Sequence, residues 1–206
     1  MLARLGMAGI SLFALCASVL HVLMARDEPW RMSEFANSPY AALWMVGAYG
    51  LAGGSLCVLA ALAPALPKGK ASVFSIALLS VGGIGAVLIA SFPVDVGPAT
   101  TPSGHIHEQS LGPTIASMGT AMVVLGNVFS RTEGWRKLAP ASLWLGVLVG
   151  VAGAGFLAAQ IIGNPWVLPA QRLMVAGILA WLGLISLRLM RGPGTPQPTL
   201  QLLPRQ

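Results

Sequence analysis

Apolar residues of this chain fall into six long blocks that are separated by short polar segments. Each block is about as long as the roughly 20 residues that a helix needs to cross a hydrocarbon layer about 30 Å thick. None shows the strict alternation that is typical of a strand. The pattern therefore predicts an all-α fold, a polytopic bundle of six transmembrane helices, at about 5–24, 39–64, 70–92, 107–129, 139–161 and 167–190.

The six blocks form one predicted domain, residues 1–190, and a polar tail follows it. The tail, residues 191–206, contains four prolines in "RGPGTPQPTLQLLPRQ" and shows no periodicity. Such a composition is typical of a flexible extension. We therefore expect residues 191–206 to be a flexible cytoplasmic tail.

The charged residues indicate how the bundle is oriented. Only 9% of the residues are charged, against roughly 25% in ordinary soluble domains. Nine basic residues fall on the side of the N-terminus, and Arg26, Arg31 and Arg172 fall on the other side. Because loops rich in Lys and Arg stay in the cytoplasm, both termini are predicted to be cytoplasmic. The net charge of +6 then reflects topology, and no nucleic-acid partner is expected.

Small residues predict how the helices pack. The block at 139–161 carries Gly146, Gly150, Ala154 and Ala158 at four-residue intervals. Such a smooth stripe lets another backbone approach closely, so this helix is expected in the middle of the bundle.

Trp44 is expected in the aromatic belt at the outer interface.

Polar side chains that could do chemistry gather on the predicted outer side, which holds all three histidines. Thr101-Pro102 is typical of a helix start, which places His105 and Glu108 on one face and turns His107 elsewhere, towards the bundle. The candidate site residues are Asp95, His107, His21, Arg172 and Glu34, with His105 and Glu108 as weaker candidates. A solvated loop would also explain the weaker two.

Several chemistries fit these residues. A metal site would use His107 and Asp95 as ligands, and a haem would need axial ligands such as His21 and His107. An Asp–His pair could act as a base with its orienting group, although no nucleophile motif accompanies it. Asp95 could equally form a salt bridge with Arg172 or Arg31. The sequence itself requires no cofactor.

The segment "FPVD", followed by a short loop and then "SGHIH", resembles the bacterial membrane family catalogued as domain of unknown function 998. The matching positions are Phe92, Pro93, Asp95, Gly104 and His107. The segment "SEFANSPYAALWMVG" also resembles the family's first outer loop. The resemblance implies a multi-helix bundle in a bacterial inner membrane, with an outer-face site centred on Asp95 and His107. It implies no established reaction.

Sparse charge within the blocks, short loops and the lack of a recognisable catalytic motif favour a non-catalytic role. The chain would then be a subunit of a larger membrane complex or a small lipid- or cofactor-binding helper, and its partners would be the bilayer and other membrane subunits. Two alternatives stay open. One is a membrane-embedded, metal-dependent hydrolase acting on lipid at the outer leaflet, and the other is a haem- or quinone-linked redox component.

Overall fold

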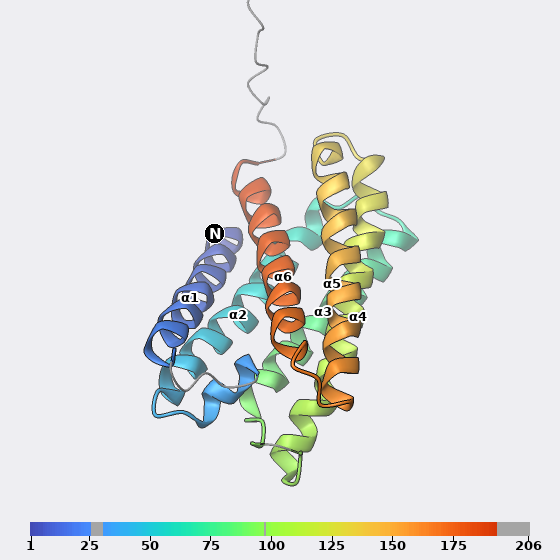
Figure 1. Cartoon of the computed structure of the whole chain (residues 1–206). Coiled ribbons are helices and arrows are strands. Elements are labelled where there is room, and N and C mark those ends of the chain that lie inside the picture. The colour runs from blue at the N-terminus through green and yellow to red at the C-terminus, as the bar shows by residue number, and fades with distance from the viewer. Residues whose placement is uncertain (26–30, 97, 193–206) are drawn as a thin grey trace, which may run out of the picture.

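Six long α-helices form the protein in the computed structural model, which describes residues 1–25, 31–96 and 98–192 (Figure 1). Each of the six is long and apolar enough to cross a membrane. This confirms the predicted all-α bundle of a multi-pass membrane protein. The helices are α1 (Leu2–Leu23), α2 (Ala41–Leu62), α3 (Lys70–Ser91), α4 (Pro102–Ser130), α5 (Ala139–Ile161) and α6 (Val167–Met190).

The helix bounds follow the apolar blocks closely, with one informative difference. Hydropathy places the start of the fourth block near residue 107, whereas α4 begins at Pro102. The hydroxyl oxygen of Thr101 accepts a hydrogen bond from the Gly104 N–H at 3.0 Å, and this cap starts the helix ahead of its apolar stretch. Of the tail predicted at 191–206, residues 193–206 lie outside the described part of the chain.

Successive helices run antiparallel, so the start of α1 and the end of α6 lie at the same end of the bundle (Figure 1). The opposite end holds the short 3₁₀ helix η1 (Met32–Asn37), the α3–α4 loop and the α5–α6 turn. We call it the η1 end. Two further 3₁₀ turns, η2 (Ala63–Ala65) and η3 (Arg136–Leu138), precede α3 and α5 at the other end.

The helix at the centre of the bundle is α4. Of its most apolar stretch 61% is buried, against 33% for each of the other five helices. Gly119 of α4 packs against the backbone of α5, where a Cβ on Gly119 would lie 3.3 Å from the Gly150 nitrogen. Small residues do bring these two helices together, but the helix predicted to be central lies beside the central one.

The predicted small-residue stripe of α5 faces its neighbours over only part of its length. Gly146 is buried, whereas Ala154 and Ala158 are exposed. With 3.6 residues per turn, positions four apart drift by about 40° at each step, so such a stripe leaves a straight contact line after two or three steps. The buried face continues instead through Val149, Gly153 and Phe156.

Backbone contact joins α1 to α2. A Cβ on Gly54 would lie 2.9 Å from the Gly6 carbonyl oxygen and 3.2 Å from the Gly9 Cα. The side chain of glycine is a single hydrogen atom, which lets two transmembrane helices approach this closely. The pair α1–α2 is therefore a tightly joined unit that packs against the rest of the bundle.

Trp44 lies in the first turn of α2, at the η1 end, but its ring is packed inside the bundle and does not face outward as a residue of an aromatic belt would. Its side chain is 7% exposed. The ring packs edge-on against Phe13 with centroids 5.7 Å apart and lies 5.9 Å from the ring of Phe35. Phe35 belongs to η1, and this 3₁₀ helix folds its apolar side over the ends of α1 and α2. Burial between these two rings outweighs the preference of a tryptophan for the interface.

Candidate functional site

Asp95 holds the α3–α4 loop against the start of α4. Its Oδ2 accepts hydrogen bonds from the N–H groups of Thr100 at 2.7 Å and Thr101 at 2.8 Å, and its Oδ1 accepts one from the Thr101 hydroxyl at 2.8 Å. The bonds from the Thr101 and Thr100 N–H groups lower the pKa of Asp95 from 3.8 to about 2. A Cβ at Gly104 would collide with this carboxylate. Asp95 therefore stabilises the loop, and both of its carboxylate oxygens already accept hydrogen bonds from Thr100 and Thr101.

His107 extends from the buried face of α4 and is 2% exposed. The expectation that it turns into the bundle is confirmed. Its Nδ1 lies 2.8 Å from the carbonyl oxygen of Phe92, at the end of α3. Among the described residues, its Nε2 has no hydrogen-bond partner. The imidazole therefore ties α4 to α3 on one side and presents a polar atom on the other.

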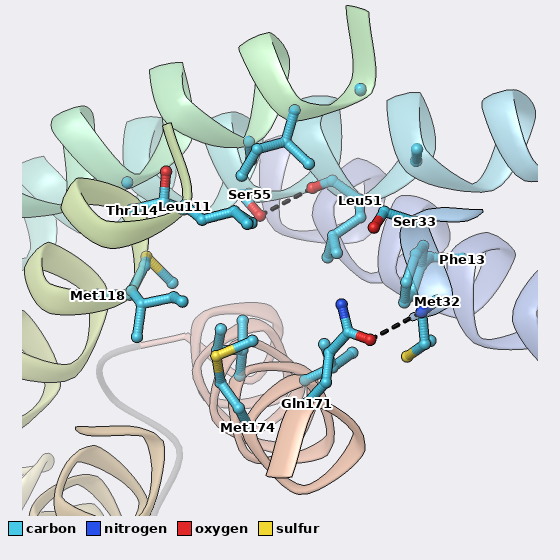
Figure 2. A pocket seen from close by; sticks show the side chains of 18 of the residues that line it. Phe13, Met32, Ser33, Leu51, Ser55, Leu111, Thr114, Met118, Gln171 and Met174 are labelled. Carbon is cyan, nitrogen blue, oxygen red and sulfur yellow. Dashed lines mark hydrogen bonds between the residues drawn. The ribbon is translucent and has the colours of Figure 1, made fainter. Parts of the chain in front are cut away.

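His107 is one of the residues that line a cavity of about 130 Å³, which Figure 2 shows from close by. The cavity is bordered by α1, α2, α3, α4, α6 and η1, and most of its wall is apolar. The larger apolar side chains are Phe13, Met32, Trp44, Leu51, Ile89, Leu111, Ile115, Met118, Met174, Val175 and Ile178. An apolar cavity of about 150 Å³ is large enough to bind benzene, so this one accommodates a small ring or a short stretch of acyl chain.

Few polar groups interrupt the apolar wall. The hydroxyls of Ser55 and Thr114 donate to main-chain carbonyls of their own helices, at 2.7 Å and 2.6 Å. Gln171 accepts a hydrogen bond from the Met32 N–H at 2.7 Å through its Oε1, and Figure 2 shows its amide nitrogen pointing away from Met32, towards the interior of the cavity. Ser33 of η1 adds a further hydroxyl, so the uncharged polar side chains on the wall besides His107 are Ser33, Ser55, Thr114 and Gln171.

A buried ion-pair cluster lies at the η1 end. Arg31, 7% exposed, donates from Nε to Glu34 at 3.0 Å and from Nη1 to Glu108 at 2.5 Å. Its Nη2 donates to the carbonyl oxygen of Asp95 at 3.2 Å. Gln160 of α5 donates to the second oxygen of Glu108. One guanidinium therefore joins η1, the α3–α4 loop and α4, and Glu108 extends the connection to α5.

The 3₁₀ helix η1 covers the cavity at this end. Met32 and Ser33 of η1 form part of the cavity wall. Besides the bonds of Arg31, the Met32 N–H is bonded to Gln171, and Asn37 donates from Nδ2 to the carbonyl oxygen of Val94 at 2.8 Å. Glu34, Glu108 and Arg31 were expected at this end, Arg31 as a salt-bridge partner of Asp95; the structure pairs Arg31 with Glu34 and Glu108 and gives it a bond to the main-chain carbonyl of Asp95. Gln171 was not among the predicted site residues.

The remaining candidates lie apart from the cavity wall. His21 of α1 has Nδ1 2.7 Å from the Ala17 carbonyl oxygen, and its ring meets Phe35 edge-on at 5.2 Å. His105 is exposed, and Arg172 is half-buried in the first turns of α6.

Asp95 and His107 are not hydrogen-bonded to each other in the described part of the chain. Each bonds instead to its own partners in the α3–α4 connection. Across the described residues, no three His, Cys, Asp or Glu side chains are grouped so that they could hold a metal ion.

Comparison with known proteins identifies the family. No curated protein and no solved structure matches the chain. The family model described as protein of unknown function, DUF998, matches residues 7–188, which include nearly all of the six helices. Within this range, the motif residues contact one another or their immediate neighbours and so join α3 to α4. They are Phe92, Asp95, Gly104 and His107. The chain belongs to the DUF998 family, as its motifs predict.

Proposed function

We propose that the protein is a non-catalytic membrane helper that holds a small, mainly apolar molecule, or the end of a lipid chain, in its cavity. The observation that carries this proposal is the cavity of about 130 Å³ among five helices, with an apolar wall and few polar atoms. Small-molecule sites typically combine such a wall with a small number of placed polar groups. Among the described residues, the wall holds no group of metal ligands such as the hydrolase alternative would need, and His21 does not line it beside His107 as a haem would need.

The size of the cavity supports an occupant. Protein interiors are close-packed and hold few voids larger than a water molecule. At about 24 cal/mol for each Å³ of cavity, an empty space of 130 Å³ costs about 3 kcal/mol. Water is a poor filler for a mainly apolar space, since each molecule needs two to four polar partners. An apolar molecule relieves this cost without requiring them.

The experiment compares two substitutions on α3. Ala86 lines the cavity, so Ala86→Leu fills part of it, whereas Ala77 is exposed on the same helix and Ala77→Leu is the matched control. Wild-type protein and the control, purified in mild detergent, are expected to carry a small molecule in native mass spectrometry, and Ala86→Leu is expected to lose it. Equal cargo in all three, or none in any, would overturn the proposal. Recovery of fixed partner subunits in place of a bound molecule would favour the complex-subunit role instead.

We further propose that the η1 end faces outward from a bacterial inner membrane, with both termini in the cytoplasm. The excess of Lys and Arg at the other end supports this orientation. In a variant without Cys16 and Cys57, Val96→Cys is expected to react with an impermeant maleimide on intact cells, because Val96 is 76% exposed in the α3–α4 loop. Lys68→Cys, at the opposite end, is expected to react only after permeabilisation. The reverse pattern would overturn the orientation.

A further inference from the structure

The side-chain amide of Gln171 has a fixed orientation at the η1 end of the cavity. A backbone N–H can only donate, so the Gln171 atom that lies 2.7 Å from the Met32 nitrogen is the carbonyl oxygen, and the other atom is the NH₂ group. Gln171 lines the cavity and is 5% exposed. Figure 2 shows the amide nitrogen pointing away from Met32, into the cavity. Gln171 therefore offers an occupant a hydrogen-bond donor and no acceptor.

The Ser33 hydroxyl is a second donor at the same end. Ser33 follows Met32 in η1, lines the same cavity and is 6% exposed. Among the described residues, neither this hydroxyl nor the Gln171 amide nitrogen forms a hydrogen bond. Neither atom is fully enclosed by its neighbours, whereas Nε2 of His107 is. A buried donor without an acceptor costs free energy, so both atoms call for a partner in the cavity.

The other hydroxyls of the wall do not supply the missing acceptor. Ser55 and Thr114 lie deeper along α2 and α4 and donate to main-chain carbonyls of their own helices. No hydrogen bond joins either of them to Gln171 in the described part of the chain. The acceptor for the η1 end therefore has to come with the occupant.

We infer that the occupant of the cavity is a neutral carbonyl compound, a ketone or an ester, whose carbonyl oxygen accepts a hydrogen bond from the amide nitrogen of Gln171. This inference rests on the proposed function and names its ligand class. A carbonyl oxygen has two lone pairs and no proton, so it also has an acceptor position for the Ser33 hydroxyl. The rest of the molecule is hydrocarbon, of a size set by the volume of about 130 Å³.

The two donors also select against other classes of ligand. A plain hydrocarbon fills the space but leaves both donors unpaired. An alcohol can accept from both donors, but it adds a proton, and a hydroxyl that accepts from Ser33 cannot also donate to it. A carboxylate would bring a charge into a space that has no Lys or Arg on its wall among the described residues. Ketones and esters are neutral and supply an acceptor without a further donor.

Two probes of one shape test the contact, namely cyclopentanone and methylenecyclopentane, in which a CH₂ group replaces the oxygen. Binding to the full-length protein in lipid nanodiscs is measured by thermal stabilisation across a concentration series. Gln171→Met removes one net hydrogen bond and should weaken cyclopentanone about three- to tenfold, while methylenecyclopentane should bind as it does to wild type. Gln109→Met, at an exposed position of α4, is the matched control and should weaken neither probe.

A second measurement uses wild-type protein and so does not depend on how well Gln171→Met folds. The side-chain amide proton resonance of Gln171 should move downfield with cyclopentanone and stay in place with methylenecyclopentane. In addition, the molecule that is released from wild type and is missing from an extract of Ala86→Leu should show a ketone or ester group by mass spectrometry and infrared absorption.

The outcomes separate this inference from the proposed function. Equal effects of Gln171→Met on the two probes, with binding still blocked by Ala86→Leu, would refute the carbonyl contact and leave the cavity function standing. A released alcohol, fatty acid or hydrocarbon would do the same. Binding of neither probe would count against the proposed function itself and would overturn the inference with it.

Discussion

Removing Arg31 should destabilise the bundle more than removing any exposed cation. The guanidinium donates to Glu34, Glu108 and the Asp95 carbonyl, and the Arg31 side chain is 8% exposed. Arg31→Met retains the apolar stem and removes the three donors. Two carboxylates, 13% and 21% exposed, then remain at the η1 end without this partner.

The expected magnitude follows from burial. Breaking a fully buried ion pair by removing one partner costs roughly 3–5 kcal/mol, whereas an exposed pair contributes about 0–1 kcal/mol. Glu108 is partly exposed and keeps its bond from Gln160, so the cost of Arg31→Met should fall at about 2–4 kcal/mol. Glu108→Gln leaves the pair of Arg31 with Glu34 intact and should cost about 1–2 kcal/mol.

A double-mutant cycle separates the pair from its surroundings. The free energy of unfolding is measured in detergent micelles for wild type, Arg31→Met, Glu108→Gln and the double variant. Side chains in contact should show a coupling energy of about 1–2 kcal/mol. Arg131→Met, at an exposed position of the other end, serves as control and should change stability by no more than about 0.5 kcal/mol. Additive effects of Arg31→Met and Glu108→Gln, or a loss no larger than the control's, would refute the reasoning.

Three further changes test separate contacts. Gly54→Ala forces a methyl against the α1 backbone and should cost about 1–3 kcal/mol, whereas Gly53→Ala meets nothing within 4 Å and should be neutral or slightly stabilising in the same unfolding assay. Because the pKa of Asp95 is lowered from 3.8 to about 2, its stabilisation is present above pH 3.8 and is lost as the pH falls to about 2, so thermal melts of wild type and Asp95→Asn should converge over that range and not above it. Ser142→Ala removes the acceptor of the Trp181 indole N–H, a buried bond of 2.9 Å, and should lower the free energy of unfolding by about 1–3 kcal/mol; an unchanged value would contradict it.

The helices could be predicted from the sequence because each is a continuous apolar block whose length the bilayer dictates. The cap of α4 was also readable, since Thr101 and Pro102 are local signals. The order in which the six helices are buried could not be predicted from the sequence. Helix α4 is the least apolar of the six, with a mean hydropathy of 1.3 in its best stretch, yet it is the central one. In a bilayer the most apolar helices can face lipid, so hydropathy does not rank helices by burial.

The candidate site was predicted in part. Position along α4 separates buried His107 from exposed His105, and helical geometry indicates this from sequence alone. The partner of Arg31 could not be predicted, because Glu108 follows it by 77 residues and the pairing exists only once α4 packs beside η1. Gln171 has the same difficulty, since its partner Met32 is 139 residues away. Neither Arg31 nor Gln171 belongs to a recognisable motif.

The bonds that hold η1 in place also affect the rate at which a molecule could enter or leave the cavity. If the cavity holds a molecule as proposed, leaving past η1 requires the bonds of Arg31, the Met32–Gln171 bond and the Asn37–Val94 bond to break together. Such concerted opening belongs to the microsecond-to-second range of local unfolding and not to the nanosecond range of side-chain motion. Exchange by this route is therefore slow even for a weakly held molecule, and loosening Arg31 should shorten its residence before it changes its affinity.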